Sequence, residues 1–229
     1  MDSFYQGIAS AAQGMSILEV IAVILGVAYL VLAMRQNILC WYAAFGSTAI
    51  FSWLFWDVSL VMESGLNVYY LIMAVYGWWV WRGNAQASSA LSAGTTAGIE
   101  AIEIKAVEIK RWSLSRHALV IIGILLISLA TGYGLEQNTS AALPYLDSFT
   151  TWGAVITTYM VAQKILENWL YWLVIDTVAI YLYIDRELYL TALLMCIYVV
   201  LAVLGWFMWL KEYRQQNEST TTSLAASTA

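Results

Sequence analysis

The amino-acid sequence predicts an all-α membrane protein, a single domain of seven transmembrane helices in a 3+1+3 parallel-repeat arrangement. Three observations predict it: a strongly apolar composition, seven long apolar runs, and an internal match between the two ends of the chain. Of the 229 residues, 62% are hydrophobic and 11% are charged, and the mean hydropathy is +0.71. A soluble domain of this size cannot bury so much apolar surface in one core.

The apolar runs are continuous, which favours helices over strands, because a helical span needs about 20 apolar residues to cross about 30 Å of hydrocarbon. We expect the first span to be retained, since the residues before it carry Asp2 and no Lys or Arg, unlike the basic start of a cleavable signal peptide. The predicted spans are 17–34, 38–56, 66–81, 118–135, 145–162, 168–184 and 188–210.

These spans organise the chain into repeats and connections. The parts are a first three-helix repeat at 17–82, a cytoplasmic linker at 83–116, a connecting helix at 117–136, a second three-helix repeat at 145–211 and a cytoplasmic tail at 212–229. The linker begins with small residues and ends in IEAIEIKAVEIKRW, which we expect to form a brief helix or strand at the membrane surface. We expect no catalytic role for it.

The basic residues predict the orientation of the helices. Only Arg186 lies on the side of the N-terminus and the even-numbered loops. By the positive-inside rule the opposite side is cytoplasmic, so the N-terminus lies outside and the C-terminus lies in the cytoplasm. That opposite side holds Arg35, Arg82, Lys105, Lys110, Arg111, Arg116, Lys164, Lys211 and Arg214.

An internal match appears when the chain is shifted by 128 residues. The clearest copy joins YGWWVWR to LGWFMWLK. Spans one to three therefore repeat as spans five to seven, and the fourth span connects them. Three spans leave the chain on the opposite side of the bilayer and the fourth brings it back, so both triplets run in the same direction. Transporters with parallel repeats hold their substrate between the repeats near the midplane, although duplication of a packing unit would give the same match. The matched pairs are Glu19 with Asp147, Trp41 with Trp169, Tyr70 with Tyr198, Gly77 with Gly205, Trp78 with Trp206 and Trp81 with Trp209.

The sixth span contains a polar stripe. Residues four apart share a helix face, so Asn168, Trp172 and Asp176 align, with Trp169 beside them. A carboxylate near the centre of a span costs about 2.5–3.5 kcal/mol on insertion scales and should face the bundle interior or water. No Lys or Arg lies at that depth. Asp176 is therefore protonated, hydrogen-bonded to another helix, or placed for a cation that a ligand supplies.

The third span carries a second stripe, in which Asn67 and Tyr70 are the preferred candidates. Aromatic faces bind flat and cationic ligands, but tryptophans near span ends also form interfacial belts. We therefore expect Trp78, Trp81, Trp206 and Trp209 to belong to a belt. The repeat adds Trp41, which corresponds to Trp169, and Thr48, which corresponds to Asp176. The fifth span is rich in threonine, and we expect part of it to line a cavity, with hydroxyl-mediated helix packing as the alternative.

The sequence lacks the residues that several functional classes of protein need. The only histidine, His117, has no HExxH motif or His/Cys cluster around it, and there is no GxSxG, so we expect neither an enzyme nor a metal or cofactor site. Lys211 lies at the cytoplasmic edge of the last span, too shallow to bind retinal in a photoreceptor. The two cysteines, Cys40 and Cys196, are expected to be buried free thiols. A proton-coupled carrier stays open, while a membrane scaffold would leave the polar stripes unexplained.

The chain resembles the PnuC family of vitamin transporters over nearly its whole length. The resemblance rests on SILEVIAVILGVAYLVLAMRQN at 16–37, LNVYYLIMAVYGWWVW at 66–81 and KILENWLYWLVIDTVAIYLY at 164–183. It implies a three-plus-one-plus-three bundle, a homotrimer in the bacterial inner membrane, and facilitated diffusion of a vitamin that cytoplasmic phosphorylation then traps. It implies no ATP hydrolysis, no coupling ion and no nucleic-acid partner.

Two positions depart from the pattern of the family members that carry nicotinamide riboside. Those members tend to have Asn where this chain has Asp176 and Ala74. Nicotinamide riboside remains the family default, thiamine follows closely because it is also an aromatic cation, and neutral riboflavin is third. The hypothesis is a passive carrier that stacks the vitamin ring between aromatic residues. The candidate substrate-binding residues are Trp41, Thr48, Asn67, Tyr70, Asn168, Trp169, Trp172 and Asp176.

Overall fold

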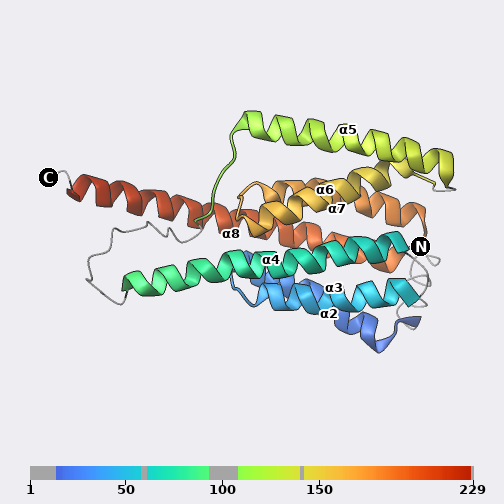
Figure 1. Cartoon of the computed structure of the whole chain (residues 1–229), viewed down its shortest axis with the longest axis horizontal. Coiled ribbons are helices and arrows are strands. Elements are labelled where there is room, and N and C mark those ends of the chain that lie inside the picture. The colour runs from blue at the N-terminus through green and yellow to red at the C-terminus, as the bar shows by residue number, and fades with distance from the viewer. Residues whose placement is uncertain (1–13, 58–60, 93–107, 140–141, 228–229) are drawn as a thin grey trace.

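A computed structural model gives the structure of the chain and describes residues 14–57, 61–92, 108–139 and 142–227. Lys105 and most of the predicted surface segment at 99–112 lie outside these residues, as does the start of the chain that was assigned to the outer side. The described part contains seven helices and no extended sheet (Figure 1). They are α2 (Ile17–Met34), α3 (Cys40–Asp57), α4 (Val61–Ser92), α5 (Leu114–Asn138), α6 (Pro144–Ala162), α7 (Asn168–Asp185) and α8 (Tyr189–Ser227).

The ends of the helices follow local sequence as well as hydropathy. The Ser16 hydroxyl accepts a hydrogen bond from the Glu19 amide at 3.1 Å, so α2 begins with a capped first turn where the prediction placed it. Both α4 and α8 continue well past the apolar runs that predicted them. Both extensions are mostly polar: the one of α4 is rich in Ala and Ser, and the one of α8 begins with Lys, Glu, Arg and Gln, which have high helix propensity, before a run of Thr and Ser.

The helices form two groups of three. Helix α3 packs against α2 and α4, and α7 packs against α6 and α8. The groups meet where α4 contacts α6 and where α2 contacts α8. Helix α5 lies at one side of the bundle and packs mainly against α6 (Figure 1). Near its start, His117 Nδ1 also lies 2.9 Å from the Tyr171 hydroxyl of α7. In chain order α5 stands between α4 and α6.

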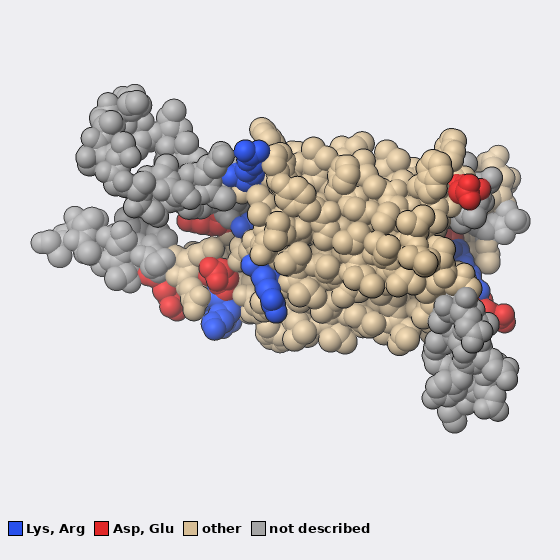
Figure 2. Space-filling view, turned by 90° about the horizontal axis from the view of Figure 1, so that it is seen from below, with Lys and Arg blue, Asp and Glu red and all other residues tan. Residues whose placement is uncertain are grey.

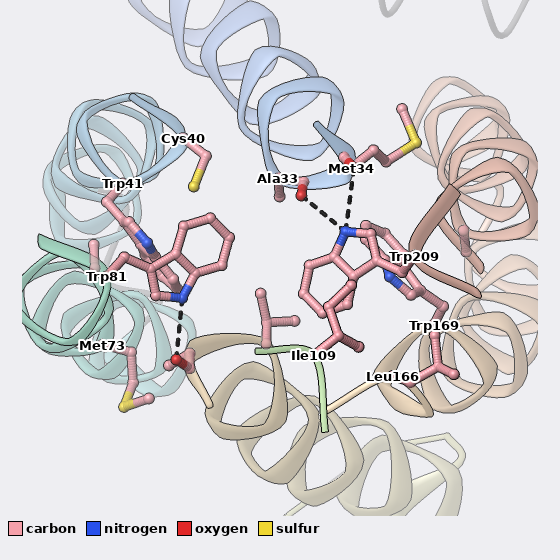
Figure 3. Packing of buried hydrophobic residues seen from close by; sticks show 14 residues of the cluster. Ala33, Met34, Cys40, Trp41, Met73, Trp81, Ile109, Leu166, Trp169 and Trp209 are labelled. Carbon is pink, nitrogen blue, oxygen red and sulfur yellow. Dashed lines mark hydrogen bonds between the residues drawn. The ribbon is translucent and has the colours of Figure 1, made fainter. Parts of the chain in front are cut away.

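A buried aromatic cluster occupies the contact region of the two groups (Figure 3). The Trp41 and Trp81 rings meet edge to face with centroids 5.3 Å apart and an interplanar angle of 87°. The Trp169 and Trp209 rings do the same at 5.4 Å and 88°. Edge-to-face pairs are the favoured arrangement of aromatic rings. The two pairs occupy positions that are 128 residues apart, so the sequence match extends to side-chain packing.

Two glycines make room for these rings. A Cβ atom on Gly77 would lie 2.3 Å from the Trp41 ring, and a Cβ atom on Gly205 would lie 2.6 Å from the Trp169 ring. No real Cβ approaches another atom so closely. Glycine at both positions therefore lets α3 approach α4, and α7 approach α8, across an indole face.

The indole N–H groups of the same cluster cross from one group to the other. Trp81 Nε1 donates to the Ala162 carbonyl at 3.1 Å. Trp209 Nε1 donates to the Ala33 and Met34 carbonyls, each at 3.2 Å. These carbonyls belong to the last turns of α6 and α2, where the helix offers no amide four residues further on; of the three, Ala33 O also accepts from the Gln36 amide of the following turn. Each group thus satisfies the helix end of the other.

The prediction of an interfacial belt is wrong for two of its four tryptophans. Trp81 is 4% exposed and Trp209 is 0% exposed, so both lie in the core instead of at a lipid surface. Trp78 and Trp206 are half-buried. The position of these tryptophans along the helix predicts their depth in the bilayer, but only the packing of the helices decides whether they face the core or the lipid.

Charge separates toward the two ends of the bundle. Lys and Arg gather at the end where α2 and α6 finish, with Arg186 at the opposite end, and a broad uncharged band lies between (Figure 2). Arg186 forms an ion pair with Asp147. Within the described part of the chain, three helical stretches are long and apolar enough to cross a bilayer by length and composition: Ile17–Met34, Leu114–Asn138 and Tyr189–Glu218.

Candidate functional site

The polar stripe predicted on the sixth span lies on α7. Asn168 is 0% exposed, Asp176 is 5% exposed, and Trp172 between them is half-buried. Asn168 is the first residue of α7, and its Nδ2 donates to the Ile165 carbonyl at 2.7 Å, which fixes the side chain against the preceding turn. Trp169, also at the start of the helix, is 1% exposed. The stripe therefore faces the bundle interior.

Several polar atoms of these residues are buried without a hydrogen-bond partner in the described part of the chain. They include the indole nitrogens of Trp41, Trp169 and Trp172 and the Oδ1 atom of Asn168. A buried polar atom without a partner costs about 1–3 kcal/mol. Two donors and one acceptor are thus left without a partner in the first turns of α7, with a third donor at the start of α3, and they favour a ligand that both donates and accepts hydrogen bonds.

Asp176 makes no hydrogen bond or ion pair among the described residues, although it is buried. Its electrostatic neighbours are Tyr70 and Tyr198, which are neutral phenols. A buried carboxylate is normally paired with a cation or held by hydrogen bonds. Of the alternatives left open by the sequence, a hydrogen bond from another helix is therefore absent from this part of the structure.

The two tyrosines occupy corresponding positions. Tyr70 lies on α4 and Tyr198 lies on α8, and both are half-buried. The Tyr198 hydroxyl lies 2.9 Å from the place where a Cβ on Gly26 would stand, so α2 provides a glycine against it. Tyr29 of α2 interacts electrostatically with both tyrosines. Carboxylate and phenols together form a polar centre made from α2, α4, α7 and α8.

Tyr29 and Tyr198 are absent from the residues predicted from sequence. The signal for Tyr198 was present, because the repeat pairs it with Tyr70. Tyr29 carries no such signal, since a tyrosine inside an apolar run reads equally well as a packing residue. Only the approach of α2 to α8 places it near Tyr198.

Other predicted residues have local roles. The Thr48 hydroxyl donates to the Ala44 carbonyl of its own helix at 2.8 Å. Trp41 is 2% exposed and packs against Trp81. Asn67 is half-buried on α4, about one helical turn from Tyr70. The structure thus groups Tyr70 with Asp176, whereas the hydrogen bonding of Thr48 stays within α3.

The threonines of α6 also use their hydroxyls locally. Thr157 donates to the Gly153 carbonyl and Thr158 donates to the Ala154 carbonyl, each at 2.7 Å. Both side chains are buried. These two hydroxyls serve the backbone of their own helix, so among the described residues they form no hydrogen bond to another helix, and the expectation that part of α6 lines a cavity stays a prediction.

The cysteines differ from one another. Cys40 at the start of α3 is a free thiol with 0% exposure, as predicted. Cys196 is also free, but it is exposed on α8, so the prediction that it is buried is wrong. The apolar run around Cys196 gave its depth in the helix and left its outward direction undetermined.

The chain was compared with sequence models of protein families, and it matches a family of transporters. The model described as "Nicotinamide mononucleotide transporter" matches residues 16–211. This range runs from the cap of α2 into the part of α8 that lies beyond Trp209, and it includes every candidate residue named above.

Two relatives and one solved structure resemble the chain along most of its length. Proteins named "Nicotinamide riboside transporter PnuC", from Escherichia coli (strain K12) and Shigella flexneri, are each 21% identical over 235 residues, covering 92% of this chain and 92% of the relative. A structure titled "Crystal structure of the Vitamin B3 transporter PnuC" superposes with a TM-score of 0.65 at 18% identity, covering 93% of this chain and 89% of the other. The last comparison shows a shared fold.

Proposed function

The chain belongs to the nicotinamide mononucleotide transporter family, which includes the PnuC proteins, and we propose that it carries a vitamin-type aromatic cation by facilitated diffusion. Its relatives are named as transporters and not as enzymes. Family membership and the long apolar helices make it a membrane transporter of a small molecule of the vitamin or mononucleotide type.

The unpartnered carboxylate of Asp176 carries the proposal that the substrate is a cation. It is buried beside two phenol rings, and neither ring supplies a positive charge. A cationic ring between aromatic side chains would satisfy the carboxylate and gain from the ring faces. The free indole N–H groups and the Asn168 Oδ1 atom would bind hydroxyl, amide or amino groups of the same ligand.

Nicotinamide riboside is the first candidate because the relatives from two bacteria are named as transporters of it. Thiamine is the second, and the departures at Asp176 and Ala74 favour it. Ala74 is 2% exposed and belongs to the core cluster, so this position offers no amide to a ligand. Both molecules are aromatic cations, so charge does not separate them. The family members that carry nicotinamide riboside tend to have Asn at these two positions, and this chain has Asn at neither.

For the mechanism we propose that the two helix triplets, in a 3+1+3 arrangement with α5 as connector, rock against each other around the site. The corresponding tryptophan pairs at an offset of 128 residues support this arrangement. The position of α5 in the chain between α4 and α6, and its packing mainly against α6, support its role as connector. Phosphorylation of the vitamin in the cytoplasm would maintain the gradient, so the carrier itself needs no coupling ion.

We also propose the placement in the membrane. The basic end of the bundle faces the cytoplasm by the positive-inside rule, which puts the N-terminus outside and the C-terminus inside the bacterial plasma membrane. The resemblance to the PnuC family supports a homotrimer. No cofactor takes part in this function.

The test is binding and uptake by purified protein with nicotinamide riboside and thiamine measured side by side. Calorimetry should show micromolar binding of one of them, and liposomes should take it up without an imposed proton or sodium gradient. Failure of both ligands to bind would overturn the proposed site. A strict requirement for an ion gradient would instead identify a coupled carrier.

A further inference from the structure

Two turns at corresponding positions meet at the basic end of the bundle. The α2–α3 turn comprises residues 35–39 and the α6–α7 turn comprises residues 163–167. Gln36 and Lys164 both adopt left-handed backbone geometry with φ of 52°. Lys164 Nζ donates to Gln36 Oε1 at 3.0 Å. With the indole bonds of Trp81 and Trp209 nearby, contacts between the two halves close this end of the bundle.

The two turns have the same internal hydrogen bonds. In each, a left-handed residue and the residue after it donate their amides back to the end of the preceding helix. The corresponding bonds are Gln36 N to Ala33 O and Lys164 N to Val161 O, both 3.0 Å, and Asn37 N to Leu32 O and Ile165 N to Met160 O, both 2.9 Å. The local geometry of the turns therefore gives no reason for one to open more readily than the other.

A strap of extended chain, residues 108–113, binds one of these turns. Lys110 N donates to the Lys164 carbonyl at 2.9 Å, and Leu166 N donates to the Lys110 carbonyl at 2.8 Å. Ile109 is 3% exposed and lies on the Trp169 and Trp209 side of the aromatic cluster (Figure 3). Its amide donates to Gln216 Oε1 of α8 at 3.2 Å. The strap thus joins the α6–α7 turn to α8.

Glu167 anchors the other end of the strap. Arg111 Nε donates to Glu167 Oε1 at 2.7 Å, and Trp112 N donates to Oε2 at 3.4 Å. The hydrogen bond with Glu167 raises the pKa of the Arg111 guanidinium. Glu167 is only 6% exposed, and His117 Nε2 lies 3.7 Å from its Oε2 atom. A buried carboxylate held in this way makes the strap and the α6–α7 turn one unit.

The α2–α3 turn has no corresponding cover among the described residues. Arg35, Asn37 and Leu39 are exposed. The Asn37 side chain is used inside the turn, where its Oδ1 accepts from the Leu39 amide at 2.9 Å. Among the described residues, this turn is joined to the rest of the bundle by the hydrogen bond from Lys164 to Gln36, by the Trp209 indole at the end of α2, and by Ile38, which packs on the aromatic cluster.

We infer that the basic end opens asymmetrically, with the strap holding the α6–α7 turn in place while the α2–α3 turn moves away from it. This inference rests on the proposed transport function, since only a carrier needs the end to open. The asymmetry comes from the strap, because the two turns otherwise correspond in backbone geometry and in cross-half contacts. Glu167 acts here as a positioning residue for the strap.

Amide hydrogen exchange of the purified protein, without ligand, tests the inference. After correction for intrinsic rates, the amides of Gln36 and Asn37 should exchange at least 10-fold faster than those of Lys164 and Ile165. The shared hydrogen-bond pattern makes the two turns internal controls for each other. Equal protection of the two turns, or stronger protection of the α2–α3 turn, would overturn the inference.

Variants that release the strap provide the second arm. Glu167→Gln and Arg111→Gln should each speed exchange at Lys164 and Ile165 about 10-fold and leave Gln36 and Asn37 unchanged. Arg111 is half-exposed, so its variant keeps the inference testable if loss of the buried carboxylate unfolds the protein. Glu136→Gln, at the opposite end of the bundle, is the matched control. Unchanged exchange at the α6–α7 turn in both variants would contradict the inference, whether or not a vitamin binds.

Discussion

Lys164 donates a hydrogen bond to Gln36 across 3.0 Å, and the two residues occupy corresponding positions in the two halves of the chain. The same ammonium lies 4.6 Å from the centre of the Trp81 ring. A neutral amide and an indole face are therefore its direct partners. Burial lowers the pKa of Lys164 from 10.5 to about 8, and the influence of Cys40 and Glu212 offsets this only in part.

This lowered pKa predicts a stability that rises at alkaline pH. Below about pH 8 both the folded and the unfolded states hold the proton, and the folded state bears the full cost of the buried charge. Between about 8 and 10.5 the unfolded state binds more protons than the folded state, so the free energy of unfolding increases with pH. The upper limit of the gain is about 3 kcal/mol.

Thermal unfolding at pH 7.5 and pH 9.5 measures the effect. Lys164→Gln should remove most of the rise between the two pH values, whereas Lys211→Gln, an exposed lysine at the same end, should keep it. The comparison across pH cancels the loss of the hydrogen bond to Gln36. If both variants show the same rise as the native chain, the ammonium of Lys164 is not desolvated.

Asp176→Asn is expected to weaken binding of the cationic vitamin by 10-fold or more, because it removes the only charge that the buried stripe offers. Binding of a neutral analogue with the same ring should change less than 2-fold. Asp147→Asn serves as the control, since that carboxylate is already paired with Arg186. Calorimetry compares the native protein with the two variants. An unchanged affinity of Asp176→Asn for the cationic vitamin would mean that Asp176 has only a packing role.

Gly205→Ala should destabilise the protein by about 1–3 kcal/mol, the usual cost of overpacking a core. The added methyl group would lie 2.6 Å from the Trp169 ring. Gly77→Ala should act in the same way against Trp41, at 2.3 Å. Gly123→Ala has nothing within 4 Å and should leave stability unchanged or slightly raised. Thermal unfolding in detergent would show a similar loss for all three if the indole contacts were not the cause.

Trp209→Phe is expected to cost about 1–3 kcal/mol, because the Met34 carbonyl loses its donor and the Ala33 carbonyl keeps only the Gln36 amide, while the ring volume is largely kept. Trp79→Phe changes an indole that is 68% exposed and should be neutral. Denaturant or thermal unfolding of the two variants separates the hydrogen bond from the general effect of losing an indole. Equal stability of both would mean that the α2 carbonyls find other partners.

The sequence predicted the core of each helix well and some of its ends poorly. Hydropathy located both ends of α2 correctly, because the polar residues Ser16 and Arg35 stand directly before and after its apolar run. It stopped α4 near Trp81 and α8 near Leu210, since both helices continue on residues with high helix propensity and little hydrophobicity. Apolar runs report where a bilayer would be crossed, and helices continue beyond that region.

The candidate site could be predicted as far as one helix face determines it. Spacing by four identified the stripe from Asn168 to Asp176 before any packing was known. Tyr29 enters only through the approach of α2 to α8, which no local pattern encodes. The strap was equally inaccessible, because Lys110 meets a turn that lies more than fifty residues further along the chain. Contacts of that range depend on topology.

The indole of Trp209 also has a consequence for the order in which the protein is made. Helix α2 leaves the ribosome long before α8, yet the donor for the carbonyl of its last residue, Met34, comes from Trp209, 175 residues further along the chain. Until α8 has been synthesised, that carbonyl must be hydrated or held by another protein. The early half of the nascent chain therefore waits in the membrane for its own C-terminal helix before it can reach its final packing.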